Sequence, residues 1–263
     1  MDNDSKMTKE KQGGAVYSAP AIEKGFNVIE LLAREQSGLT VSEIATGLGL
    51  SVSEIFRIIM VMERRGWLRK YSGDKFRVTP MVLALAFRAT PAEDLSAIAL
   101  PYMRTLCNET DQSCHMVIRN ADKGLIIARY QNPGPTGFHV RIGSEIDLET
   151  SCSGHVLLAF SSEPIHTRQS SASEDVRVNS LISAVKERGF ERMESARTLG
   201  VTDISYPIFD MHGDVAAALT VPFLRRIDGT QVMSMEDTQG VLAETAKRVS
   251  EELAAGNHFI VAK

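Results

Sequence analysis

The side chains best suited to chemistry lie in the second half of the chain. Ser153 and His155 are two residues apart, and a serine beside a histidine could serve nucleophilic catalysis. Thiol, imidazole and carboxylate groups in the same region could together hold a transition metal. The residues with such groups are Cys114, His115, His139, Cys152, His155 and Asp203. A hydrolytic enzyme and a metal-sensing protein are therefore the first two classes to weigh.

Neither class has the spacing that its chemistry requires. The sequence contains no G-x-S-x-G element, P-loop, H-E-x-x-H pair or nucleotide-binding glycine fingerprint. A two-residue Ser–His spacing is not by itself a catalytic pair, and no cysteine or histidine follows a recognised zinc pattern. We expect no enzymatic activity, no cofactor and no dedicated metal site. A metal sensor remains the alternative, and elemental analysis would separate it from a sensor of organic molecules.

The composition is that of a soluble globular protein with room for two cores. Of 263 residues, 43% are apolar and 24% charged. The polar N-terminus shows no secretory signal, and no apolar run approaches the roughly 20 residues of a membrane helix. The three cysteines form no CxxC pair, which favours reduced thiols. These features predict a cytoplasmic protein without membrane contact.

Charge is unevenly divided along the chain. Residues 1–90 hold 13 Lys and Arg against 10 Asp and Glu, whereas residues 91–263 hold 16 against 23. Within the first part a positive stripe occupies residues 54–77, and its members are Arg57, Arg64, Arg65, Arg69, Lys70, Lys75 and Arg77. Such a stripe is typical of a phosphate-binding face, with a solvated helix surface as the alternative interpretation.

The stripe begins at the second of two capping boxes. Thr40-Val41-Ser42-Glu43 and Ser51-Val52-Ser53-Glu54 each place a glutamate three residues after a hydroxyl, which marks a helix start. They predict helices over 41–47 and 52–65, joined by a turn in which Gly49 supplies a positive φ. Ala45 is small where the helices approach, and Ile55 returns to the shared core, so a helix-turn-helix unit is expected.

The remaining pattern predicts one small helical domain and one α+β domain. In the first we expect a helix over 20–36, a hairpin around Ser72-Gly73-Asp74 as a wing, and a helix over 80–89. In the second, helices are expected at 92–110, 154–161, 177–188 and 235–254, with a polar loop at 162–175. Strands are expected at 114–119, 124–130, 137–142, 202–209 and 214–221, forming an antiparallel sheet with helices on it.

Long segments of both parts resemble one family. The stretches are "AIEKGFNVIELLA", "GLTVSEIATGLGLSVSEIFRIIMVMERRGWLRK", "GFHVRIGSEIDLETSCSGHVLLAF" and "GVTDISYPIFDMHGDVAAALTVP". They are similar to the winged helix-turn-helix and GAF-like effector-binding domains of the IclR family of bacterial transcriptional regulators, over roughly residues 20–255. The resemblance implies a homodimer or homotetramer that binds double-stranded promoter DNA and responds to a small-molecule effector, often a carboxylic or aromatic acid.

The domains expected on this basis are a disordered tail (1–18), the DNA-binding domain (19–79), a linker helix and hinge (80–91), the effector-binding domain (92–255) and a C-terminal tail (256–263). The second capped helix should bury Ile58, Ile59 and Met62 beside Ile55 and lie in the major groove. The candidate DNA-contacting residues are Thr40, Ser51, Val52, Ser53, Glu54, Arg57, Arg64, Arg65, Lys70, Lys75 and Arg77.

By the same resemblance the effector pocket involves Leu148, Cys152, Ser153, Gly154, His155, Asp203, Ser205 and Thr220. Asp203 and Ser205 share one face of a strand, and the helix start at Ser153-Gly154 offers N–H donors to a carboxylate. A hydroxylated or aromatic carboxylic acid fits this set. The chain departs from the family pattern at Ser51–Glu54, His155 and Asp203. Glu54 is either a reader of cytosine or only the capping partner of Ser51, and the cap is favoured.

Overall fold

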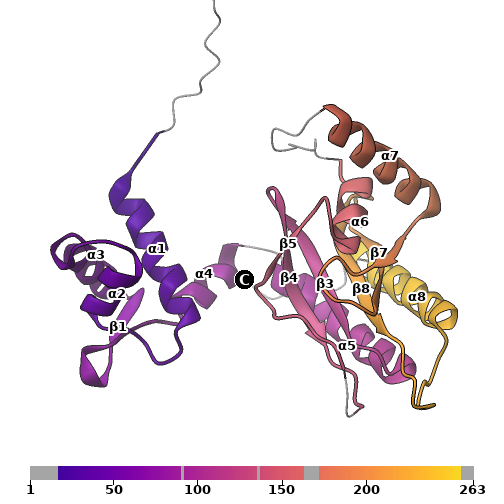
Figure 1. Cartoon of the computed structure of the whole chain (residues 1–263), viewed down its shortest axis with the longest axis horizontal. Coiled ribbons are helices and arrows are strands. Elements are labelled where there is room, and N and C mark those ends of the chain that lie inside the picture. The colour runs from indigo at the N-terminus through magenta and orange to yellow at the C-terminus, as the bar shows by residue number, and fades with distance from the viewer. Residues whose placement is uncertain (1–16, 90–91, 135–136, 163–171, 256–263) are drawn as a thin grey trace, which may run out of the picture. The chain divides into compact units, whose positions relative to one another are not determined.

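The computed structural model describes residues 17–89, 92–134, 137–162 and 172–255 (Figure 1). The chain divides into two compact units between Thr90 and Pro91. The tails expected at 1–18 and 256–263 lie outside the described residues, apart from Tyr17 and Ser18. The same is true of the two central hinge residues and of most of the loop expected at 162–175.

The first unit is a helical domain with a hairpin. Its elements are α1 (Pro20–Arg34), α2 (Val41–Gly47), α3 (Val52–Arg64), β1 (Leu68–Lys70), a 3-10 turn (Ser72–Asp74), β2 (Phe76–Val78) and α4 (Met81–Ala89). The strands pair antiparallel, with Arg69 opposite Arg77. The core contains Val28, Leu32, Ile44, Ala45, Ile55, Ile59, Leu68 and Phe76. The predicted helices and hairpin are confirmed.

Both capping boxes are formed. Thr40 accepts from the Glu43 N–H and Ser51 from the Glu54 N–H, while each glutamate accepts from the N–H of its cap residue. Gly49 has φ +65° in the turn between the helices, and Ile55 is fully buried. Because the boxes satisfy backbone donors at both helix starts, they fix where α2 and α3 begin.

The second unit is an α+β domain around one antiparallel sheet, ordered β5-β4-β3-β8-β7-β6. The strands are β3 (Cys114–Asn120), β4 (Lys123–Tyr130), β5 (Glu145–Asp147), β6 (Glu191–Glu194), β7 (Val201–Phe209) and β8 (Val215–Leu224). The helices are α5 (Ala92–Thr110), α6 (Cys152–Phe160), α7 (Ala172–Arg188) and α8 (Met235–Ala254). Helices α5 and α8 pack on one face of the sheet, and α6, with α7 against it, packs on the other (Figure 1).

Two strand expectations differ from the structure. The strand predicted at 137–142 is wrong: this segment is irregular, and the strand comes after it as β5. Gly143, at φ +82°, turns the chain there, and its N–H donates to the Ile126 carbonyl. Strand β6 was not predicted, because its sequence, Glu-Arg-Met-Glu, is charged; an edge strand tolerates such residues. Helix α7 also begins at Ala172, before the expected residue 177.

We expect glycine to be required at one helical position and dispensable at another. A Cβ on Gly154 would lie 2.3 Å from the Leu148 carbonyl oxygen, whereas a Cβ on Gly240 in α8 would meet nothing within 4 Å. Gly154→Ala should lower the free energy of unfolding by about 1–3 kcal/mol through overpacking. Gly240→Ala should raise it by about 0.5–1 kcal/mol, because alanine favours a helix. Denaturant unfolding measures both, and equal effects would contradict the close approach.

Candidate nucleic-acid interface and ligand face

Helix α3 presents a polar and cationic face to solvent. Ser53, Arg57 and Arg64 recur at near-helical spacing and are exposed, opposite the buried Ile55 and Ile59. Among the described residues, neither Arg57 nor Arg64 has a hydrogen-bond or ion-pair partner. Their guanidinium groups are therefore available to an anion or to base edges.

Glu54 belongs to the cap and to α1. Its Oε2 accepts from the Ser51 N–H at 3.0 Å and the Ser51 hydroxyl at 2.7 Å, while its Oε1 pairs with Lys24 Nζ at 3.0 Å. Hydrogen bonds from Ser51 and then Lys24 lower the pKa of Glu54 to about 2. Both carboxylate oxygens are engaged, so the interpretation of Glu54 as the capping partner of Ser51 is confirmed.

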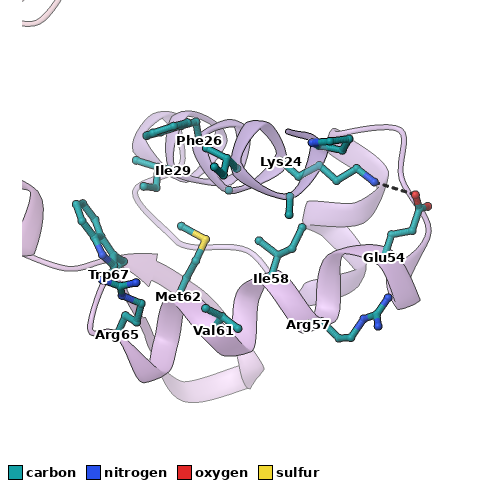
Figure 2. Close-up of a pocket in the computed structure, with 14 residues that line it drawn as sticks. Lys24, Phe26, Ile29, Glu54, Arg57, Ile58, Val61, Met62, Arg65 and Trp67 are labelled. Carbon is teal, nitrogen blue, oxygen red and sulfur yellow. Dashed lines mark hydrogen bonds and ion pairs between the residues drawn. The ribbon is translucent and has the colours of Figure 1, made fainter. Parts of the chain in front are cut away.

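An apolar groove of about 740 Å³ lies between α1 and α3 (Figure 2). Phe26 and Ile29 of α1 face Ile58 and Met62 of α3 across it. The Lys24–Glu54 pair and Arg57 lie at one end of the groove, and Arg65 and Trp67 at the other. Arg57 and Arg65 therefore border this groove, whereas Arg64 does not.

The basic residues of the hairpin differ in how far their charged groups are engaged by other residues. Lys70 pairs with Asp74 at 2.8 Å on the surface, and Arg77 donates to the Ser37 carbonyl and lies over the Tyr71 ring. Hydrogen bonds from Thr40 lower the pKa of Glu43, and the charge of Lys75 adds to this effect. The positive charge of Lys75 is therefore near the start of α2, where backbone N–H groups also favour an anion.

In the second unit, polar residues stand in register across five neighbouring strands. We call them the polar row: Glu191 (β6), Ser205 (β7), Thr220 (β8), His115 (β3) and Arg129 (β4). Directly opposed residues of antiparallel strands share a face. This is the α6 face, because Ala218 and Val117, two residues further along β8 and β3, pack in the same core as α6.

The two ends of the polar row carry opposite charges that are held by hydrogen bonds. Glu191 accepts from Arg188 at 2.6 Å and lies 3.3 Å from His155 Nδ1. Burial favours a raised pKa for Glu191, but hydrogen bonds from His155 and the Arg192 N–H, with the Arg188 charge, lower it. Arg129 donates to the Val140 carbonyl at 2.8 Å.

Four of the expected pocket residues are occupied by contacts within the protein. His155 donates Nε2–H to the Glu149 carbonyl at 2.8 Å, and the Cys152 thiol donates to the Glu191 and Asp203 carbonyls. Leu148 is a core residue, and Gly154 lies directly against its backbone. These contacts join the start of α6 to β6 and β7, so the four residues shape this face.

The other four expected pocket residues, which are Ser153, Asp203, Ser205 and Thr220, offer polar groups to the α6 face of the sheet. Ser205 and Thr220, both buried, share a hydrogen bond of 2.7 Å. Ser153 is 3% exposed, and within the described part of the chain its hydroxyl has no hydrogen-bond partner. Burial raises the pKa of Asp203 to about 6, although the Ser195 hydroxyl donates to its carboxylate. Ser153 and Asp203 therefore have unused hydrogen-bonding capacity.

His115 was not among the residues expected to bind an effector. It is 7% exposed, has no hydrogen-bond partner among the described residues, and burial lowers the pKa of its ring to about 4. A neutral imidazole both donates and accepts. The sequence did contain a signal for His115. Side chains alternate between the two faces along the predicted strand at 114–119, which puts His115 on the face opposite Cys114. Cys114 instead contacts Cys107 in the α5 core.

The metal-sensing alternative depended on six residues that the fold does not gather into one site. Cys114 points to the α5 face and His115 to the α6 face, while His139 is exposed in the segment before β5. Within the described ranges, no three His, Cys, Asp or Glu residues are placed to hold a metal ion.

Comparison with known proteins identifies the family. Residues 21–71 match the IclR helix-turn-helix domain, and residues 87–251 match the C-terminal domain of the bacterial transcriptional regulator IclR. The chain belongs to the IclR family. It is 21% identical to the DNA-binding transcriptional repressor YiaJ of Escherichia coli K12, over 96% of this chain and 93% of that protein. It is 25% identical to the regulator BhcR of Paracoccus denitrificans, over 89% and 87%.

Solved structures of IclR proteins share the fold. An IclR homologue from Microbacterium hydrocarbonoxydans, solved with 4-hydroxybenzoate, has a TM-score of 0.73 at 22% identity and covers 89% of this chain and 99% of its own. An IclR regulator from Alicyclobacillus acidocaldarius has a TM-score of 0.68 at 20% identity, covering 91% and 99%. The predicted fold, a helix-turn-helix domain followed by an α+β domain with an antiparallel sheet, is confirmed.

The IclR assignment makes this chain a DNA-binding transcriptional regulator. Its homologues are regulators of transcription, in keeping with the expectation that it is not an enzyme. Of the helices that the structure describes, none is by itself long and apolar enough to span a membrane; α2 and α3 meet that test only as a pair, across a 116° bend.

We expect Asp203 to make stability depend on pH. Its folded-state pKa of about 6 exceeds the ordinary aspartate value of 3.8, so the native state keeps a proton that the unfolded chain releases. The free energy of unfolding should therefore fall as the pH rises from about 3.8 to about 6, and it should stay lower above this interval. Asp203→Asn should be more stable than the parent at pH 7.5, by up to about 3 kcal/mol, with no difference near pH 3.5.

Denaturant unfolding across this pH range measures the effect. Ser195→Ala is the matched variant: it removes the hydrogen bond that opposes the shift, so the pH-dependent interval should extend to higher pH. If the free energies of unfolding of Asp203→Asn and the parent differed by the same amount at every pH, the raised pKa of Asp203 would be contradicted.

Proposed function

We propose that this IclR-family regulator binds promoter DNA in the cytoplasm through α3 and the hairpin wing, and that a small hydroxylated or aromatic carboxylic acid bound on the α6 face modulates that binding. The observation that carries the effector proposal is a set of polar groups with unused hydrogen-bonding capacity on the α6 face. The side chains of His115 and Ser153 are buried and have no hydrogen-bond partner among the described residues. The Asp203 carboxylate, which accepts from Ser195, is buried enough to raise its pKa. Buried polar groups are costly unless hydrogen-bonded, and a bound ligand would satisfy them.

For DNA, the expected contacts fall into three groups. Arg57 and Ser53, with Val52, project from the first turns of α3, where a helix reaches base edges. Thr40 and Ser51 lie at the starts of α2 and α3, where N–H groups and the helix dipole favour phosphate. Positive charge for the phosphate backbone comes from Arg64, Arg65, Lys70, Lys75 and Arg77.

The effector class follows from the polarity of the α6 face. Arg129 in the polar row and the N–H groups of Cys152 and Ser153 at the start of α6 favour a carboxylate. The Gly154 N–H, expected to serve in the same way, donates instead to the Ser151 hydroxyl. Asp203 and neutral His115 suit a hydroxyl group, which both donates and accepts. The Microbacterium homologue was solved with 4-hydroxybenzoate, which carries both groups, and this supports a hydroxylated aromatic acid here.

We also infer that the regulator acts as a homo-oligomer, a dimer or tetramer. Helix α4 exposes Met81, Val82, Leu83 and Leu85, and α1 exposes Ile22 and Phe26 beside the groove of Figure 2. Exposed apolar side chains gathered on single helices favour association. A twofold assembly would place two copies of α3 about one helical turn of DNA apart, on a palindromic site.

Arg57 should read sequence, while Lys75 should contribute affinity. Arg57→Ala should reduce the ratio of specific to non-specific affinity by about 10-fold or more, through loss of a bidentate contact to guanine. Lys75→Ala should weaken both kinds of complex alike and flatten the log–log salt slope by up to about 0.9 per subunit. Mobility-shift titrations on DNA from the upstream region of its own gene, at several salt concentrations, measure both quantities.

If Arg57→Ala weakened both kinds of complex equally, Arg57 would be only a phosphate contact. A protein that retarded no such DNA at low salt, with or without candidate acids, would contradict the proposed binding surface.

The α6 face should bind hydroxybenzoic acids or close analogues. A thermal-shift screen of small organic acids should find a stabilising compound, and calorimetry on the full chain then gives its Kd. His115→Ala and Asp203→Asn should each weaken binding about tenfold. The first removes a buried hydrogen-bonding partner, and the second replaces a carboxylate acceptor by a neutral amide. His139→Ala is the matched control: this histidine is exposed outside the polar row, and its loss should leave Kd unchanged. Unaltered affinity in both test variants would put the ligand elsewhere.

A further inference from the structure

Two apolar side chains project from the start of α3. Val52 and Phe56 are each 48% exposed and lie four residues apart, on adjacent turns of one side of the helix. The core side of α3 is filled by Ile55 and Ile59, both fully buried, so folding does not require an aromatic residue at 56. Phe56 was absent from the expected contacts, although it lies immediately before Arg57.

The polar side chains at this end of α3 are largely committed to one another. Ser51 accepts from the Glu54 N–H and donates to Glu54 Oε2, and its oxygen lies 3.1 Å from that of Ser53. Glu54 is held further by Lys24 of α1. Reading a base edge through these groups would open the capping box. Besides the Ser53 hydroxyl, which contacts Ser51, the groups that remain for base contact are the guanidinium of Arg57 and the apolar surface of Val52 and Phe56.

The major groove offers one apolar feature, the C5-methyl group of thymine, and phenylalanine is among the side chains that contact it. We infer that Phe56, with Val52 beside it, determines specificity by contacting a thymine methyl group next to the base pair that Arg57 contacts. The inference rests on the proposal that α3 enters the major groove. It explains why half-exposed apolar side chains stand on the helix that carries Arg57.

Replacing thymine by deoxyuridine tests the contact, because it removes the methyl group and keeps every hydrogen-bonding group. A binding site is first selected from random duplex DNA with the full-length parent protein. Each thymine of that site is then replaced in turn. At one or two positions per half-site the replacement should weaken parent binding about fourfold, the effect of exposing one buried methyl group.

The same duplexes are then titrated with three variants. In Phe56→Ala the loss on replacing thymine should disappear, while Phe56→Leu should keep part of it. Val61→Ala is the matched control, because Val61 is 45% exposed on the same helix but lines the groove toward α1, so it should retain the full fourfold loss. Circular dichroism and binding to non-specific DNA verify that each variant is folded.

Two results would overturn the inference. One is a selected site in which no thymine replacement affects the parent protein. The other is a loss of equal size in the parent and in folded Phe56→Ala, which would place the methyl contact on another residue. Failure to select any site would overturn the DNA-binding surface itself, and this result is distinct from the other two.

Discussion

The pairing of β8 with β7 on one side and β3 on the other is the constraint on which the second unit depends. It puts Ser205 opposite Thr220 and Thr220 opposite His115. A shift of one residue in any of these strands would exchange its two faces, moving polar side chains into the α5 and α8 core and apolar ones under α6. The polar row follows directly from this register, and so does the placement of Asp203 on the same face as Ser205.

In the first unit the equivalent role belongs to the capping boxes. They determine where α2 and α3 begin, and so which residues of α3 face the core and which face solvent. Glu54 stays exposed, but the box at Ser51 engages one of its carboxylate oxygens and Lys24 of α1 pairs with the other. A negative charge that would repel phosphate is thereby paired, which leaves Arg57, beside Val52 and Phe56, as the polar residue proposed to read the DNA sequence.

Helices and edge strands differ in how well the local sequence pattern predicted them. Helices with caps and 3–4 residue periodicity were found nearly to the residue, as in α2 and α8. Edge strands were not: β6 is charged and was missed, and the alternating segment at 137–142 is irregular. An edge strand has a neighbour on one side only, so its sequence is weakly constrained. The backbone of the irregular segment at 137–142 is held by the turn at Gly143 and by the Arg129 side chain, which donates to the Val140 carbonyl.

The sequence by itself determined the helix-turn-helix, its caps, the outward arginine and the family, because these depend on contacts within about a dozen residues and on motif order. Tertiary structure decided which polar residues have free hydrogen-bonding groups. Cys152 and His155 lie within two residues of Ser153 in sequence, yet these two are held by β6, β7 and Glu149, whereas the Ser153 hydroxyl has no partner among the described residues. His115 joins Ser205 and Thr220 only through strand pairing across a hundred residues. Such pairings are set by packing across the sheet, which no local spacing specifies.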